Sequence, residues 1–109
     1  MKLPPDSLIP LEKLTHYLLV PQRRADKSAF LLRGGYTAEN PRQLLEDLRS
    51  QVLPLDATPV GSTRFGEFFQ VRGSLHGPSG KNLRVKTIWM REHLREVTRF
   101  ITLLPDKTK

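Results

Sequence analysis

The sequence has 109 residues, with 18 Lys and Arg against 11 Asp and Glu and a formal net charge of +7. This length suits one domain with one core, and no apolar run approaches the ~20 residues of a membrane span. The absence of cysteine excludes disulfides and thiolate metal sites, and the proline-containing N-terminus does not resemble a secretory signal. We therefore expect a cytoplasmic protein with no membrane partner.

The positive charge is concentrated in the second half of the chain. Residues 1–61 hold eight Lys and Arg and seven Asp and Glu, whereas residues 62–109 hold ten and four, which gives net charges of +1 and +6. Clustered cations bind polyanions because they release the counterions condensed on phosphates. RNA is therefore the first partner to consider, and a cation excess that serves only solubility is the alternative.

Residues 1–9 are expected to be extended and residues 10–53 to form helices. Pro10 suits the first position of a helix, which should end near Leu19 because Pro21 disfavours helical backbone before it. The second helix is expected to start at the N-cap Asp26 and to end at Gly34 and Gly35. Its predicted inward side chains are Ala29, Phe30 and Leu32.

The third helix has the clearest start. Asn40 is predicted as the N-cap, Pro41 as the first helical residue, and Gln43 as the partner in a variant of the capping box. Pro54 is expected to end the helix. Its predicted apolar face consists of Leu44, Leu45, Leu48 and Val52.

Beyond residues 56–63, which form either a connecting loop or a ragged edge strand, the apolar period changes to two. Residues 64–105 are therefore predicted to form an antiparallel sheet. Pro78, Ser79 and Gly80 suit a three-residue hairpin loop with Gly80 in the left-handed region, and this loop sets the register. The predicted pairs are Leu75 with Leu83, Gly73 with Val85, Val71 with Thr87, Phe69 with Trp89, Ser74 with Arg84, Arg72 with Lys86, and Gln70 with Ile88.

A third strand is expected at residues 96–104, between a turn at residues 92–95 and Pro105. Both of its faces are partly apolar, so it is either the central strand or a strand with helices above and a partner below. Residues 106–109 are expected to be a frayed tail. The predicted fold is α+β, one domain over residues 1–109 in which two or three N-terminal helices pack on a C-terminal antiparallel meander of three to four strands.

No motif for metal or cofactor chemistry is recognisable. His16, His76 and His93 lie far apart in sequence and lack a known ligand spacing. No serine lies in a nucleophile-elbow context, and Gly34 and Gly35 follow a helix instead of opening one as in a phosphate-binding loop. We therefore expect no metal site and no cofactor.

The predicted hairpin gathers Arg72, Arg84 and Lys86 on one face of two adjacent strands. Arg72 faces Lys86, and like charges directly opposite each other are destabilising unless an anion or an acid lies between them. Either the long cationic side chains extend into water, or they form a cleft that holds a phosphate.

A second basic spot is predicted at the entrance of the second helix, where Arg23, Arg24 and Lys27 lie near backbone N–H groups that favour an anion. Aromatic side chains on the strands could stack on unpaired bases, although aromatic residues on strands beside helices usually belong to the core. The residues in question are Phe68, Phe69, Trp89 and Phe100.

Four segments of the sequence together resemble a bacterial family of domains of unknown function. They are the segment LEKLTHYLL at residues 11–19 with Lys27 downstream, the segment FGEFFQVRGSLHGPSG at residues 65–80, and the segments TIW and RFITLLP at residues 87–89 and 99–105. The residues that fall on the family pattern are Lys27, Trp89, Arg99 and Thr102. Where the family has a histidine before the lysine, this chain has Gln22, Arg23 and Arg24.

The resemblance implies a small protein encoded beside another small protein, or a C-terminal module of a toxin-like chain. It also implies a fold similar to the barnase, EndoU, colicin and RelE group of ribonuclease toxins. Our hypothesis is a small basic RNA-binding protein that cleaves RNA without a metal, as the toxin half of a toxin–antitoxin-like pair. Its expected partners are RNA and a small acidic, antitoxin-like protein.

In this hypothesis Arg72, Lys86 and Arg99 hold the scissile phosphate, and Lys27 acts as an electrostatic group or, if it is buried, as a proton donor. His16 or His76 would replace a missing base. An ideal strand places Arg99 and Thr102 on opposite faces, so both reach one cleft only if the strand has a bulge. The other expected nucleic-acid contacts are Arg23, Arg24, Arg84 and Thr102.

Two other functions remain open at this stage. The chain could be a non-catalytic interaction module that presents its basic sheet face to an acidic partner protein. It could also be a structural domain whose charge serves only solubility.

Overall fold

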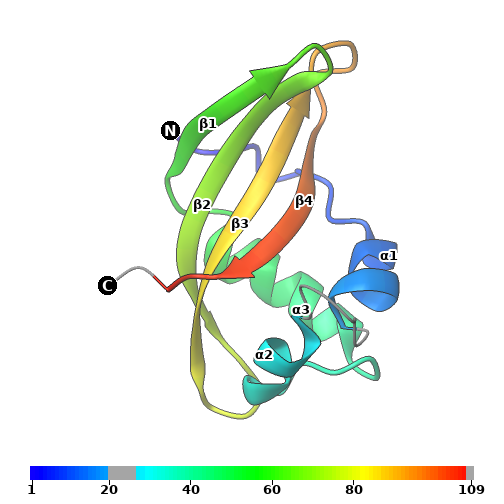
Figure 1. Cartoon of the computed structure of the whole chain (residues 1–109), viewed down its shortest axis with the longest axis vertical. Helices are drawn as coiled ribbons and strands as arrows, with labels where there is room; N and C mark the ends of the chain where they lie inside the picture. Colours follow the sequence, from blue (N-terminus) through cyan, green and yellow to red (C-terminus); the bar gives the residue numbers. More distant parts are fainter. Residues whose placement is uncertain (20–26, 108–109) are drawn as a thin grey trace.

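The computed structural model of the chain describes residues 1–19 and 27–107 (Figure 1). Four antiparallel strands lie side by side in the order β1-β2-β3-β4. They span Ala57–Thr63 (β1), Gly66–His76 (β2), Asn82–Glu92 (β3) and Thr98–Pro105 (β4). Figure 1 shows the helices gathered beside one end of the sheet, while the other end extends beyond them. The predicted α+β class, with helices before an antiparallel meander, is confirmed.

The helical part contains two wide turns of the π type. Helix α1 (Leu11–Lys13) continues as η1 (Leu14–Leu18), and helix α3 (Pro41–Asp47) continues as η2 (Leu48–Val52). Each wide turn closes with a bond between residues five apart, from the N–H of Leu19 to the C=O of Leu14 at 2.9 Å and from that of Leu53 to Leu48 at 2.8 Å. Helix α2 (Ser28–Arg33) lies between them in sequence.

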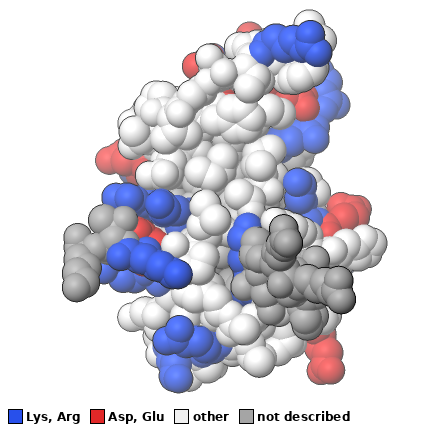
Figure 2. Space-filling view, viewed as in Figure 1, with Lys and Arg blue, Asp and Glu red and all other residues white. Residues whose placement is uncertain are grey.

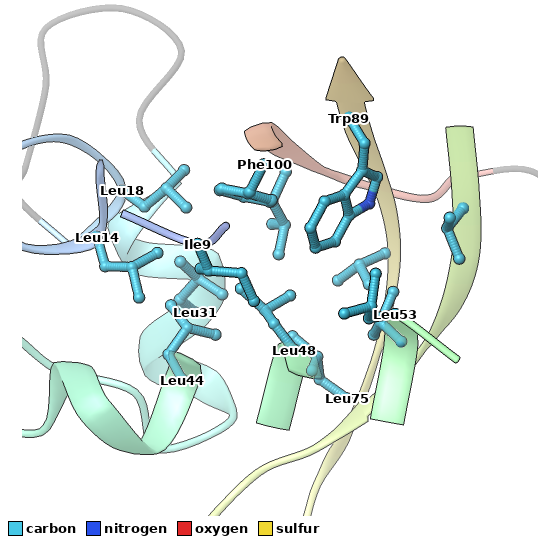
Figure 3. Packing of buried hydrophobic residues seen from close by; sticks show 14 of the residues in the cluster. Ile9, Leu14, Leu18, Leu31, Leu44, Leu48, Leu53, Leu75, Trp89 and Phe100 are labelled. Atoms are coloured by element: carbon cyan, nitrogen blue, oxygen red, sulfur yellow. The ribbon is translucent and has the colours of Figure 1, made fainter. Parts of the chain in front are cut away.

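The hydrophobic core lies between the helices and the face of the sheet that carries Trp89 (Figure 3). The rings of Trp89 and Phe100 meet edge to face, with centroids 5.4 Å apart and an interplanar angle of 74°. The Trp89 indole N–H donates to Thr87 Oγ1 at 2.7 Å, and this hydroxyl donates to the Val71 carbonyl at 3.0 Å. Phe69, Trp89 and Phe100 are buried, so they are core residues and do not offer stacking surfaces for bases.

The register of the β2–β3 hairpin agrees with every pair expected from the sequence. The N–H of Gly77 donates to the carbonyl of Lys81 at 3.1 Å, which closes a three-residue loop. Within that loop Gly80 has a φ of +87°, the left-handed backbone that a side chain disfavours. Turn chemistry and apolar alternation favour the same register, which explains why the prediction succeeds.

The hairpin loop also completes the end of α2. The backbone N–H of Ser79 donates to the Gly34 carbonyl at 3.0 Å, and its hydroxyl donates to the Arg33 carbonyl at 2.9 Å. These two carbonyls belong to the last turn of the helix, which lacks partners of its own. Gly77 approaches Gly34 so closely that a Cβ atom at Gly77 would overlap its carbonyl oxygen.

Two expectations about the helices are wrong. Helix α2 buries Leu31, whereas Ala29 and Leu32 are exposed; of the three predicted inward residues, Phe30 is half-buried and packs against the core as expected. In α3 the capping box does not form, because the Asn40 side chain accepts from the backbone of Thr37 at 2.7 Å and donates to Gly35 at 3.0 Å. The Asn40 side chain therefore stabilises the turn before the helix. The predicted N-cap Asp26 lies outside the described residues.

Both outer strands differ from regular edge strands. Strand β1 is the ragged edge strand that was one of two expectations for residues 56–63, with a register shift between Pro59 and Gly61. Strand β4 is the opposite edge and not the central strand. Leu8 covers the start of this edge, since its N–H donates to Thr98 at 2.8 Å and its carbonyl accepts from Phe100 at 2.7 Å.

Within the described parts of the chain, no helix is long and apolar enough to span a membrane.

Candidate functional site

Lys27, Tyr17 and Thr102 meet at the edge of β4, and we call these three residues the edge cluster. The Lys27 ammonium donates to Thr102 Oγ1 at 2.9 Å and to the Tyr17 hydroxyl at 3.4 Å. It also lies 5.1 Å from the centre of the Tyr17 ring, within the range of a cation–π contact. Lys27 is only 8% exposed, whereas Tyr17 is 40% exposed. The cluster is therefore a nearly buried cation beside an accessible aromatic residue.

Three elements supply the edge cluster. Lys27 precedes α2 as its N-cap, Tyr17 belongs to η1, and Thr102 belongs to β4. The core residues Leu14, Leu18 and Leu31 hold η1 and α2 in place, because each is buried among the other apolar side chains. Lys27 and Thr102 are predicted from the sequence as separate contacts, and the structure brings them together across 75 positions.

A bulge in β4 decides which face Thr102 occupies. The β3–β4 ladder pairs Trp89 with Phe100 but Ile88 with Thr102, so Ile101 is an additional residue. Arg99 lies opposite Met90. Residues directly opposite each other in an antiparallel ladder share a face. Arg99 and Thr102 therefore share the face of Met90 and Ile88, as the sequence analysis required of any cleft that includes both.

The same face carries the cations of the hairpin. We call Arg72, Arg84 and Lys86 the cationic row, and we call the face of the sheet turned away from the core the outer face. Lys86 lies opposite Arg72 on β2 and opposite Leu104 on β4. Thr102 lies two residues before Leu104, so it is a diagonal neighbour of Lys86 at about 7–8 Å. The edge cluster and the cationic row thus adjoin.

An acid lies within the cationic row. Arg72 Nε is 3.7 Å from Asp106 Oδ2, and the Asp106 side chain is only 5% exposed. The Asp106 N–H donates to the Arg84 carbonyl at 2.9 Å, which extends the ladder beyond β4. Asp106 is therefore not part of a frayed tail. Figure 2 shows Lys and Arg side chains gathered near this end of the chain.

Arg99 is held at another part of the outer face. Its guanidinium pairs with Glu92 at 2.9 Å, and Arg95 binds the same carboxylate at 2.8 Å. Hydrogen bonds from Arg95, with the charges of Arg95 and Arg99, lower the pKa of Glu92 below its usual value, although partial desolvation opposes them. Arg99 pairs across the ladder with Met90, whereas Lys86 lies four residues before Met90 in β3. Arg99 is therefore separated from the cationic row.

The histidines do not join the edge cluster through any hydrogen bond among the described residues. His76 Nδ1 lies 2.8 Å from Asn82 Oδ1, and His93 Nε2 lies 3.2 Å from the Thr63 carbonyl. His16 is exposed and adjoins Tyr17 in η1. In residues 1–19 and 27–107, no group of three His, Asp or Glu side chains could hold a metal ion.

Two residues of the site, Tyr17 and Asp106, are not predicted from the sequence. Tyr17 reads as part of an apolar helix, and only its place beside Lys27 gives it a role. In the sequence, Asp106 belongs to a polar C-terminal segment. The signal that could have found it is the like-charge pair of Arg72 and Lys86, which is destabilising unless an acid lies nearby. Arg23 and Arg24, the other predicted nucleic-acid contacts, lie outside the described residues.

The arrangement can bind and neutralise an anion. An ammonium group has three N–H donors, and two of those of Lys27 are directed to hydroxyl oxygens. Among the described residues no carboxylate forms an ion pair with Lys27, so its charge is not neutralised by them. A desolvated cation attracts a developing negative charge more strongly than one in water.

Comparisons with known proteins identify a family and a fold. A family model described as "Domain of unknown function (DUF6883)" matches residues 5–107. No curated protein matches the sequence. Among solved structures, the chain is similar to one in the "Contact-dependent growth inhibition toxin - immunity protein complex from Klebsiella pneumoniae 342". The identity is 16%, the TM-score is 0.57, and the match covers 94% of this chain and 96% of that chain, which indicates a shared fold.

Proposed function

The chain belongs to the DUF6883 family of domains of unknown function, and from this premise we propose that it is a toxin-type domain that binds RNA and cleaves it without a metal ion. The observation that carries the proposal is the edge cluster, where a nearly buried ammonium group contacts two hydroxyls. Burying a charge costs free energy unless it is paired. Such costly groups occur preferentially at functional sites.

The proposed reaction uses the 2′-hydroxyl of RNA as the nucleophile. Its oxygen forms a bond to the adjacent phosphorus while the bond from phosphorus to the 5′-oxygen breaks, which yields a 2′,3′-cyclic phosphate and a 5′-hydroxyl. Lys27 stabilises the added charge on the phosphate oxygens and gives a proton to the departing 5′-oxygen. We assign the acceptor of the 2′-hydroxyl proton to His16, which adjoins Tyr17 in η1. Thr102 orients the ammonium of Lys27.

The cationic row has the role of binding the RNA backbone in this proposal. Lys86 is a diagonal neighbour of Thr102 in the ladder, so phosphates next to the scissile one would reach Lys86, Arg84 and Arg72. Such contacts position the strand without selecting its sequence. The similar fold in a toxin–immunity complex supports a toxin or immunity role and a protein partner.

The test is cleavage of a fluorescein-labelled single-stranded RNA in EDTA by the wild type, Lys27→Met and Lys81→Met. Lys81 is an exposed residue beside the hairpin loop, so its substitution removes the same charge away from the edge cluster. We expect wild type and Lys81→Met to cleave alike, with 2′,3′-cyclic phosphate ends, and Lys27→Met to be at least ~10²-fold slower. Intact RNA with the wild type, or equal cleavage by Lys27→Met, would contradict the proposal.

A second candidate function is a non-catalytic interaction module, favoured by the exposed Arg72 and Arg84 and the half-buried Lys86 of the outer face. Arg84 and Lys86 form no ion pair with the described acids, so an acidic partner protein could neutralise them. In that case RNA stays intact in the assay above. An acidic partner would instead bind the wild type and lose affinity for Arg84→Ala and Lys86→Ala together.

A further inference from the structure

Asp106 occupies a position that an external anion would favour. Its side chain is 95% buried, and its carboxylate pairs with Arg72 at 3.7 Å. A buried carboxylate requires such partners because removing it from water is costly. The carboxylate of Asp106 is therefore held in place by charge.

The ladder shows how Asp106 reaches Arg72. The backbone of Asp106 bonds to Arg84 on β3, whereas Arg72 lies on β2, on the far side of β3. Neighbouring strands are about 4.8 Å apart, so the ion pair spans the width of β3 on the outer face. Arg84 and Lys86 stand on β3 on that same face. The outer face thus carries three cations, Arg72, Arg84 and Lys86, near the single carboxylate of Asp106.

Resting on the proposed function, we infer that the cationic row is a phosphate subsite that Asp106 fills in the free protein and that a phosphate group of the ligand takes over. Consecutive phosphates of a polyanion together carry more negative charge and more acceptor oxygens than one carboxylate, so they can bind Arg72, Arg84 and Lys86 together. Because the two anions compete for the same cations, polyanion binding releases the Asp106 side chain from Arg72. Asp106 thereby weakens anion binding and occupies Arg72 between binding events.

The experiment compares Asp106→Asn with Asp6→Asn, which makes the same change of charge at another site. Asp6 is exposed and lies near Thr98 at the start of β4, whereas Asp106 follows the end of that strand. Two probes separate the sources of phosphate. One is fluorescein-labelled 2′-O-methyl oligouridylate, which binds like RNA but lacks the nucleophile, and the other is inorganic pyrophosphate.

We expect Asp106→Asn to bind the oligonucleotide at least about fivefold more tightly than Asp6→Asn. Pyrophosphate should also raise the melting temperature of Asp106→Asn more than that of Asp6→Asn. Adding Arg72→Ala to Asp106→Asn should remove both gains. Equal responses of the two single variants would overturn the inference. If pyrophosphate responds as expected but no variant binds the oligonucleotide, the subsite stands and the proposed RNA function fails.

A measurement on the wild type covers the case in which Asp106→Asn does not fold. In proton–nitrogen spectra, pyrophosphate should shift the Nε–H signal of Arg72 and the amide signal of Asp106 with the same saturation curve. The Nε–H signal of Arg91, which pairs with Glu67 at 2.8 Å at the other end of the sheet, is the control. Equal shifts at Arg91 and Arg72 would indicate general ion effects and overturn the inference.

Discussion

The ammonium group of Lys27 lies 2.9 Å from the hydroxyl of Thr102, on an edge strand that follows it by 75 residues. This contact joins the start of α2 to the bulged part of β4. Replacing Thr102 by valine keeps the shape of the side chain but leaves a nearly buried cation without its shorter hydrogen bond. We expect Thr102→Val to lower the free energy of unfolding by about 1–3 kcal/mol, measured by urea denaturation.

Thr102→Ser is the matched control, because it retains the hydroxyl and removes only a methyl group. It should keep most of the stability that Thr102→Val loses. If valine and serine behave alike, the hydroxyl does not support Lys27 and the edge cluster loses its physical basis.

The hydroxyl of Thr87 is predicted to be essential to the core beneath the sheet. It accepts from the Trp89 indole and donates to Val71, and all of these groups are buried. Thr87→Val would leave the indole N–H without an acceptor, so unfolding should become easier by about 1–3 kcal/mol. Trp89 is the single tryptophan of the chain, and its fluorescence reports the transition directly. An unchanged midpoint in Thr87→Val would show that the indole finds another acceptor.

We expect the folded protein to lose stability in alkaline solution because of Tyr36. Burial, the hydrogen bond to Asp47 at 2.6 Å and the charge of Asp47 together raise the pKa of Tyr36 well above its usual value of about 10. A group whose pKa is higher in the folded state gives its full stabilisation below its unfolded pKa. That stabilisation is lost as the pH rises above about 10.

Urea unfolding at pH 8 and pH 11 measures this effect. Wild type should lose more stability between these values than Tyr36→Phe, which has no proton to release at this position. Equal losses in the two proteins would show that another group causes the alkaline transition.

We expect alanine substitution at two glycines of the hairpin to cost different amounts of stability. A Cβ at Gly77 would overlap the Gly34 carbonyl oxygen, so Gly77→Ala should push the loop away from α2 and cost more than about 2 kcal/mol. A Cβ at Gly80 meets nothing within 4 Å, and its φ of +87° alone should cost about 1–2 kcal/mol. Thermal unfolding of the two variants gives the comparison. A larger loss in Gly80→Ala would contradict the close contact between loop and helix.

The sequence predicts the hairpin well because two independent signals agree there. The Pro78–Ser79–Gly80 loop and the alternation of apolar residues favour one register, and a slip by one residue would violate both. Helix α2 is less predictable, since it has only six residues and its exposed Leu32 matches the apolar spacing as well as its buried Leu31 does. Short helices are oriented by their neighbours more than by their own pattern.

The site is harder to predict than the fold because it depends on long-range geometry. Alternation along β4 places Arg99 and Thr102 on opposite faces, and the bulge that reverses this has no signature in the residues around Ile101. Asn40 is a residue type that suits a capping box, yet its side chain binds the backbone of Thr37 and Gly35 instead. The prediction that Arg99 binds phosphate rests on residue type, which does not reveal its ion pair with Glu92.

Ile101 is the bulge residue of β4, which has no pairing partner in the ladder to β3. Deleting it would join Phe100 directly to Thr102 and produce a regular strand, in which Trp89 still faces Phe100 and Ile88 still faces Thr102. The shortened strand would lose the additional coiling that a bulge imposes, and with it the angle at which β4 passes α2. A single deletion can thus separate the curvature of this sheet from its pairing, two properties that most changes in a strand alter together.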